Sequence, residues 1–321
     1  MDVRPRKLRP GPGAWSHVVL AVVALVTLAS CARTAAGAGA AGPGVGRIAV
    51  VAAENQYGNV ASQVGGRYVA VSSVESNPNT DPHSYEVSPG VAQAVSSAQV
   101  VIENGIGYDD YMSKIVAASP SPHRTVLDVQ HLLGLPDDTP NPHLWYSPGT
   151  MPKVAHALAG EFSRIAPAHA AYFTRNAAAF VASLGPWLTA IAQFKAGHGR
   201  TPVATTEPVA DYLLEAAGTV NRTPSTLQDD IMNGVDPSPQ DVSFQAGLFA
   251  RHRVAVFVYN EQVTDALTDG FITDAHRAGI PVVGVYETMP VPGYDYQSWM
   301  LAETHALERA VADHASTTHL S

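Results

Sequence analysis

The chain has 321 residues, of which 46% are hydrophobic and 15% are charged, and its formal net charge is −9. The hydrophobic fraction is normal for a globular protein, so a packed core is expected. A single cysteine excludes a disulfide scaffold, and the acidic balance argues against nucleic acid as a partner.

The first thirty residues have the pattern of a secretory signal. Four basic residues lie within the first nine positions, and an apolar run follows from Val18 to Leu28. That run is too short to span a bilayer comfortably, so a signal peptide is predicted over residues 1–30. Its end, Leu28-Ala29-Ser30-Cys31, resembles a bacterial lipobox. We therefore expect a lipid on Cys31; the alternative is a chance cysteine in an ordinary signal peptide.

Residues 31–46 are mostly Ala and Gly and have almost nothing to bury, which predicts a flexible tether. A lipid on Cys31 and this tether would hold a soluble body at the outer face of the cytoplasmic membrane. Without the signal, 15 Lys and Arg remain against 27 Asp and Glu, a net charge of −12.

Residues 47–148 alternate short apolar runs with helical patterns, which indicates an open α/β sheet and a first lobe. A long helical region is expected over residues 149–196, with Pro167 suited to a helix start and Pro186 able to bend the second helix. Expected strands cover residues 48–53, 68–74, 100–102 and 125–129, and expected helices cover residues 55–64, 91–98 and 108–118.

A second α/β alternation over residues 197–321 predicts a second lobe. Two doubly wound α/β lobes joined by one long rigid helix are therefore the expected architecture. Ligands of open α/β sheets bind at the carboxyl ends of the strands, which in a two-lobed protein can face each other across a cleft. Expected strands cover residues 202–204, 254–258 and 281–285, and expected helices cover residues 209–217, 239–250, 265–278 and 297–314.

A near-repeat, (Asp or Asn)-Pro-His-x-aromatic, is the most specific feature of the chain. It occurs at 81–85, with His83, and at 141–145, with His143. Proline fixes φ and favours an extended conformation for the residue before it, so each histidine is held in a pre-set position. Imidazole binds Zn, Fe, Ni and Cu, and also Mn in mixed sites. Two histidines in matching settings therefore favour a metal site over local hydrogen bonding.

Two carboxylates follow predicted strands of the second lobe. Glu207 lies at the end of the strand that opens the lobe, and Glu287 lies at the end of the last strand. Glu207 could instead be an acid stabilised by a helix N-terminus, and Asp295 is a rival to Glu287. With His83 and His143, the two glutamates are an adequate ligand set for a divalent cation.

The chain resembles the zinc/manganese-type solute-binding lipoproteins that supply bacterial ABC importers, from about Ile48 to the last helix. The segments that carry the resemblance are 52–55 (AAEN), 77–86 (NPNTDPHSYE), 103–109 (ENGIGYD), 141–145 (NPHLW) and 287–290 (ETMP).

The resemblance implies that His83, His143, Glu207 and Glu287 are the metal ligands, in a cleft between two lobes joined by a long helix. Glu287 departs from the aspartate more common there. The implied protein is not an enzyme: it is an exported monomer that binds a metal ion and delivers it to an ABC permease and its ATPase. The resemblance does not distinguish zinc from manganese as the bound metal. A shell of two histidines and two glutamates tolerates Mn²⁺, whereas most N/O sites bind Zn²⁺ more tightly, so both remain open.

Two alternatives come from other classes. A secreted zinc-dependent hydrolase could use the same residue types, although the sequence contains no His-Glu-x-x-His and no Gly-x-Ser-x-Gly. A surface adhesin with a structural metal is the other alternative, and metal uptake by cells would distinguish it from an importer component.

Overall fold

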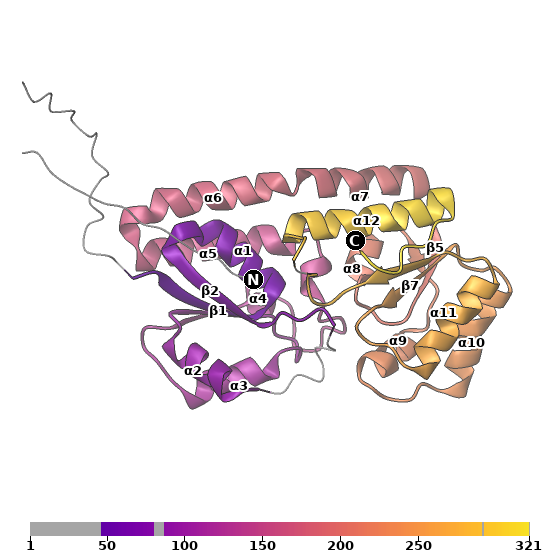
Figure 1. Ribbon diagram of the computed structural model, residues 1–321, viewed down its shortest axis with the longest axis horizontal. Coiled ribbons are helices and arrows are strands. Elements are labelled where there is room, and N and C mark those ends of the chain that lie inside the picture. The colour runs from indigo at the N-terminus through magenta and orange to yellow at the C-terminus, as the bar shows by residue number, and fades with distance from the viewer. Residues whose placement is uncertain (1–45, 80–86, 291, 321) are drawn as a thin grey trace, which may run out of the picture. The chain divides into compact units, whose positions relative to one another are not determined.

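Two sheets of four parallel strands each organise the part of the chain that the structure describes, residues 46–79, 87–290 and 292–320 of a computed structural model. Their orders are β2-β1-β3-β4 and β6-β5-β7-β8 (Figure 1). The predicted α/β fold with two lobes is confirmed. The strands are β1 (Ile48–Glu54), β2 (Val69–Glu75), β3 (Val100–Glu103), β4 (Thr125–Asp128), β5 (Pro202–Thr205), β6 (Val220–Asn221), β7 (Val256–Asn260) and β8 (Val282–Val285).

The N-terminal sheet is covered on both faces because β1 is apolar on both. Val50 and Ala52 pack in a core with α1 and α5, whereas Val51 and Ala53 pack in a separate core with α2 and α3. Successive side chains of a strand point to opposite faces, so a continuous apolar run is what a doubly covered strand requires. The helices are α1 (Asn55–Gly65), α2 (Pro89–Ser97), α3 (Asp110–Ala118), α4 (Val129–Leu133) and α5 (Thr150–Ile165).

The lobes are joined by α6 (Ala170–Ser183) and α7 (Gly185–His198), which run in one line along both lobes (Figure 1). The ladder is interrupted at Leu184, because Pro186 sits in the first turn of α7 and cannot donate a backbone hydrogen bond. The sequence predicts a bend at Pro186, and α6 and α7 are separate helices there, although they continue in nearly one direction (Figure 1). Within the described residues, Pro167–His198 is long and apolar enough to cross a membrane by length and composition. It packs here against α5, α1 and α12.

The C-terminal sheet is flanked by α8 (Asp211–Ala216), α9 (Ser225–Met232), α10 (Pro239–Ala250), α11 (Ala266–Arg277) and α12 (Tyr296–Asp313). Strand β7 begins two residues later than predicted. The pairing partners of Val256 and Val258 are Val203 and Thr205, and this register carries the strand on to Asn260. The later end places Asn260 at the carboxyl edge of the sheet.

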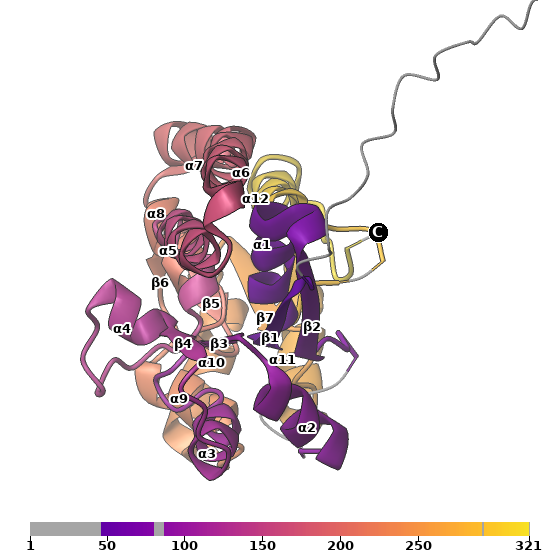
Figure 2. The same cartoon turned by 90° about the vertical axis from the view of Figure 1, so that its left-hand side faces the viewer.

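One hydrophobic core is shared by the two lobes. It includes residues of β1 and β3 from one sheet, β5, β7 and β8 from the other, and the helices α1, α5, α6, α7 and α12. Figure 2 shows these helices gathered on one side of the strands, with α2, α3 and α9 on the other. Because close-packed interiors deform little, the shared layer favours small relative motions of the lobes.

Candidate metal centre

The site lies where the carboxyl ends of strands from both sheets meet. Glu207 comes two residues after β5, Asn260 is the last residue of β7, and Glu287 comes two residues after β8. From the N-terminal lobe, Tyr108 follows β3 and His143 immediately precedes the 3-10 turn 144–146. This is the position predicted for a ligand of two facing α/β sheets.

The Asn-Pro-His loop fixes the imidazole of His143. The side-chain oxygen of Asn141 accepts from the backbone N–H of His143 at 2.9 Å and lies 2.8 Å from its Nδ1. The amide nitrogen of Asn141 donates to the carbonyl of Pro208 at 2.8 Å, so the amide cannot be flipped without losing that bond. Nδ1 therefore carries a proton, and Nε2 is directed into the site.

Nε2 of His143 faces a carboxylate. Oε2 of Glu287 lies 3.1 Å from it, and both side chains are fully buried. Tyr108 donates its hydroxyl to the same oxygen at 2.8 Å, while Asn260 donates to Oε1 at 2.6 Å. The backbone of Glu287 is held as well, since its N–H donates to Oε1 of Gln262 at 2.7 Å.

Glu207 joins the site through Asn260. The Nδ2 atom of Asn260 donates to Oε2 of Glu207 at 3.2 Å, and Glu207 is 3% exposed. Helix α8 begins only at Asp211, four residues later, so the helix N-terminus does not account for Glu207. One amide nitrogen thus lies within hydrogen-bond distance of both candidate carboxylates.

Aromatic rings close the site from the N-terminal lobe. The Trp145 ring is fully buried and lies edge-on to His143 at 5.4 Å and to Tyr108 at 5.1 Å between centroids. Burial, with the nearby charge of Glu287, raises the pKa of Tyr108 well above its ordinary value, so its hydroxyl remains a donor. A buried, low-dielectric surrounding strengthens the attraction between the carboxylates and a bound cation.

Of the four predicted ligands, the structure places His143 in contact with Glu287 and links Glu207 to Glu287 through Asn260. His83 and the lipid-attachment candidate Cys31 lie outside the described residues. Asp295, the rival to Glu287, instead caps α12, where its Oδ1 accepts from the N–H of Ser298 at 2.9 Å. Within residues 46–79, 87–290 and 292–320, no three side chains of His, Cys, Asp and Glu form a group that could hold a metal ion by themselves.

Two contributors were not predicted from the sequence. One is Asn260, the last residue of β7, whose neighbour Glu261 lies 2.6 Å from His319 in an ion-pair contact. The other is Tyr108, which was assigned only to a helix. A signal existed for Asn260, because a polar residue that ends a buried strand lies at the ligand-binding edge of a parallel sheet.

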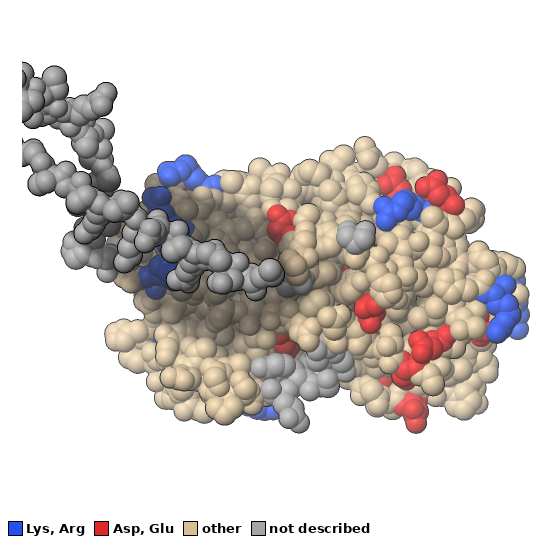
Figure 3. Space-filling view, viewed as in Figure 1, with Lys and Arg blue, Asp and Glu red and all other residues tan. Residues whose placement is uncertain are grey.

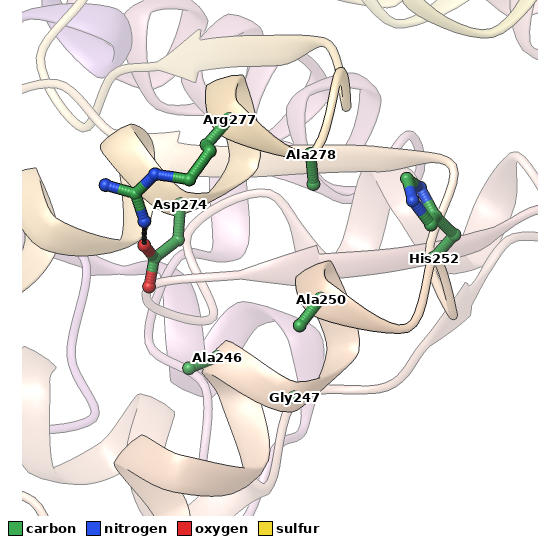
Figure 4. Close-up of a pocket in the computed structure, with 7 residues that line it drawn as sticks. All are labelled: Ala246, Gly247, Ala250, His252, Asp274, Arg277 and Ala278. Atoms are coloured by element: carbon green, nitrogen blue, oxygen red, sulfur yellow. Dashed lines mark hydrogen bonds and ion pairs between the residues drawn. The ribbon is translucent and has the colours of Figure 1, made fainter.

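A cavity in the C-terminal lobe lies away from the site. A cavity of about 480 Å³ opens between α10 and α11, lined mainly by Ala and Gly, with the ion pair Arg277–Asp274 at 2.6 Å on its rim (Figure 4). None of the described candidate ligands lines it.

On the face shown in Figure 3, Lys and Arg lie in small separate groups, and most of the Asp and Glu lie over the C-terminal half.

The fold of two parallel α/β lobes joined by a long helix pair is shared by solved bacterial metal-binding solute-binding proteins. The chain belongs to the family described as zinc-uptake complex component A, periplasmic, whose family model matches residues 50–310.

Individual proteins are also similar to the chain, in sequence or in fold. The manganese-binding lipoprotein MntA of Bacillus subtilis is 26% identical over 166 residues, which are 49% of this chain and 53% of the relative. The chain thus spans about half the length of the curated relatives it matches. In fold it is similar to the periplasmic zinc-binding protein TroA of Treponema pallidum, with a TM-score of 0.70, 16% identity, and coverage of 84% of this chain and 100% of TroA. It is also similar to the nickel complex of the solute-binding protein FpvC of Pseudomonas aeruginosa, with a TM-score of 0.68, 22% identity, and coverage of 84% and 99%.

Proposed function

We propose that the protein captures Zn²⁺ or Mn²⁺ outside the cytoplasmic membrane and delivers it to an ABC importer. His143, Glu207 and Glu287 are ligands in this proposal, and His83, outside the described residues, is the fourth. Membership in the zinc-uptake family supports the proposal. The names of the relatives support it further, one being a manganese-binding lipoprotein and another a zinc-binding protein.

The contact between His143 and Glu287 carries the proposal. Asn141 accepts from Nδ1, so a neutral imidazole would present the lone pair of Nε2 toward Oε2 of Glu287, 3.1 Å away. Two electron-pair donors at that distance repel each other unless a proton or a cation lies between them or beside them. An imidazole oriented by a second hydrogen bond, as here by Asn141, is the usual arrangement of a metal-binding histidine.

The donor types fit the two proposed metals. Imidazole nitrogen and carboxylate oxygen bind Zn²⁺ in four-coordinate sites, and carboxylate oxygen also suits Mn²⁺. The cation is the cargo, so the chain's task is binding and release and not turnover. A hydrolase has no support from the family, which consists of solute-binding proteins.

The remaining parts of the proposal concern location and partner. A lipid on Cys31 would anchor the body at the outer face of the membrane, close to a permease and its ATPase. We expect Cys31→Ala to leave the precursor uncleaved or to release the protein from the membrane. Fractionation of cells that produce each form would show which compartment holds the protein.

Release of the cargo would require the two lobes to separate at the site, and Asn55 opposes this. From the start of α1, its amide donates to the carbonyl of Met289 at 2.8 Å, and its oxygen accepts from the N–H of Met289 at 3.0 Å. Asn55 is 6% exposed. Asn55 therefore holds the loop that contains Glu287 against the N-terminal lobe.

Asn55→Ala is expected to lower the free energy of unfolding by about 2 kcal/mol, because it leaves two buried backbone groups unsatisfied. It is also expected to speed metal dissociation several-fold. Urea unfolding and stopped-flow release into a chelator would measure the two effects, with Asn233→Ala, an exposed asparagine, as the control. Unchanged stability and release would show that Asn55 does not clamp the lobes.

The proposed function is tested by titrating the metal-stripped protein with Zn²⁺ and Mn²⁺ by calorimetry. One tight site per chain is expected, and Glu207→Gln should weaken it at least tenfold, because a neutral amide replaces a buried carboxylate ligand. Glu215→Gln, on the exposed face of α8, should bind as the unaltered protein does. Absence of a tight site in the unaltered protein would refute metal capture, and normal metal uptake in a deletion strain would refute delivery.

A further inference from the structure

Asn260 occupies a central place among the candidate ligands although an amide is a poor metal ligand beside carboxylates. It is 1% exposed and ends strand β7. Its Nδ2 atom donates to Oε1 of Glu287 at 2.6 Å and to Oε2 of Glu207 at 3.2 Å. An amide nitrogen carries two hydrogens, so both are used on the two carboxylates.

The orientation of this amide is determined by its other bonds. Oδ1 of Asn260 accepts from the backbone N–H of Gln262 at 3.0 Å, and the backbone N–H of Asn260 donates to the hydroxyl of Thr206 at 2.9 Å. A flipped amide would place its oxygen against two carboxylates and lose the bond from Gln262. The nitrogen therefore faces the glutamates, and all hydrogen-bonding groups of the side chain are satisfied.

We propose that Asn260 is a positioning residue that sets how strongly the site discriminates between Zn²⁺ and Mn²⁺; this rests on the proposed function. Asn260 engages one oxygen of each glutamate, and an oxygen that accepts from an amide donates less electron density to a cation. Each glutamate is thereby directed to bind a cation through its other oxygen, which is Oε1 in Glu207 and, in Glu287, the Oε2 that also accepts from Tyr108. The carboxylates then supply two oxygen donors instead of four, whatever other groups complete the shell.

The number of donors matters because the two ions differ in preferred geometry. Zn²⁺ is satisfied by four ligands in a tetrahedron, whereas Mn²⁺ favours six-coordinate shells rich in oxygen. Glutamates that each bind through one oxygen therefore favour Zn²⁺ relative to Mn²⁺. Removing the amide would let either glutamate bind through both oxygens, which benefits Mn²⁺ more.

The test compares the ratio of dissociation constants, Kd for Mn²⁺ over Kd for Zn²⁺, in the unaltered protein, Asn260→Ala and Asn260→Ser. Asn260→Ser removes the amide without adding a charge and keeps a hydroxyl at the buried strand end, so it guards against a folding defect in the alanine variant. We expect the ratio to fall about tenfold in both, since specificity is the difference between two affinities. Asn233→Ala should leave the ratio unchanged.

A spectroscopic readout separates positioning from general loosening. Visible absorption of bound Co²⁺ is intense in four-coordinate sites and weak in six-coordinate sites, so it should weaken per bound ion in both variants of Asn260. Equal weakening of Zn²⁺ and Mn²⁺ binding, with an unchanged Co²⁺ spectrum, would overturn the inference and leave metal capture intact. Failure of the unaltered protein to bind either metal would instead refute the proposed function, and this inference with it.

Discussion

Replacing His143 by alanine is expected to weaken Zn²⁺ and Mn²⁺ binding more than 100-fold, a loss of about 2.7 kcal/mol or more in binding free energy. The change removes the only described imidazole in contact with a candidate carboxylate, Glu287 at 3.1 Å. It also releases Asn141, which holds that imidazole in place. Calorimetric titration of the metal-stripped variant measures the effect.

A matched control keeps this prediction specific. His156 lies on the exposed face of α5, and His156→Ala should bind both metals as the unaltered protein does. Because His143 is fully buried, unfolding in urea must show that His143→Ala still folds. A folded variant with undiminished affinity would remove His143 from the ligand set and, with it, the main argument for this site.

The elements that could be predicted from sequence are those whose patterns are set by burial alone. Strand β1 is apolar at almost every position, as a strand covered on both faces must be. Strand β6 has only two residues, Val220 and Asn221, too few to show the alternation of a strand. Helix α9 has eight residues, about two turns, which is a short stretch in which to recognise a helical period. Helix α4 was taken for the end of a strand and a loop because it contains only five residues.

The site could be predicted where a local motif or the end of a predicted strand determines a side chain's position, as for Glu207 and Glu287. Pro142 and Asn141 constrain His143 through neighbouring residues, so sequence reasoning reached it. Asn260 acts through its distance to Glu207 and Glu287, 53 and 27 residues away, which no local pattern contains. Such contacts appear only once the strands are paired.

Asp109 shows the same limit. It directly precedes α3, at the N-cap position, where an aspartate side chain commonly caps the helix, but its side chain does not do so. It turns back and accepts from the N–H groups of Asn104 and Gly105 at 2.6 and 2.9 Å, bracing the loop before Tyr108. Burial raises the pKa of Asp109 to about 7.

A second buried acid, Glu303 on α12, lies behind the site. It is 1% exposed, and its Oε1 accepts from the indole of Trp299 at 2.7 Å and from the N–H of Tyr286 at 3.3 Å. The hydroxyl of Tyr146, from the other lobe, donates to the carbonyl of Tyr286 at 2.7 Å. Burial raises the pKa of Glu303 to about 8, although the bonds from Tyr146, Trp299 and Tyr286 act in the opposite direction.

This raised pKa predicts a loss of stability with rising pH. The folded protein keeps a proton on Glu303 that the unfolded chain, with the ordinary pKa of 4.5, has already lost. Its contribution to the free energy of unfolding is therefore complete below pH 4.5 and falls as the pH rises toward 8. A shift of this size corresponds to a few kcal/mol, at roughly 1.4 kcal/mol per pKa unit.

Glu303→Gln should remove this dependence, because glutamine stays neutral and retains an oxygen that can accept from Trp299 and Tyr286. We expect the variant to match the unaltered protein within about 1 kcal/mol near pH 5 and to exceed it by about 2–4 kcal/mol near pH 9. Urea unfolding across this range measures the difference, and Glu308→Gln, a half-exposed position on the same helix, is the control. Parallel stability curves for Glu303→Gln and the unaltered protein would mean that Glu303 is ionised in the folded state. Its charge would then have to be stabilised by the N–H groups of Trp299 and Tyr286, because the hydroxyl of Tyr146 donates its proton to the carbonyl of Tyr286.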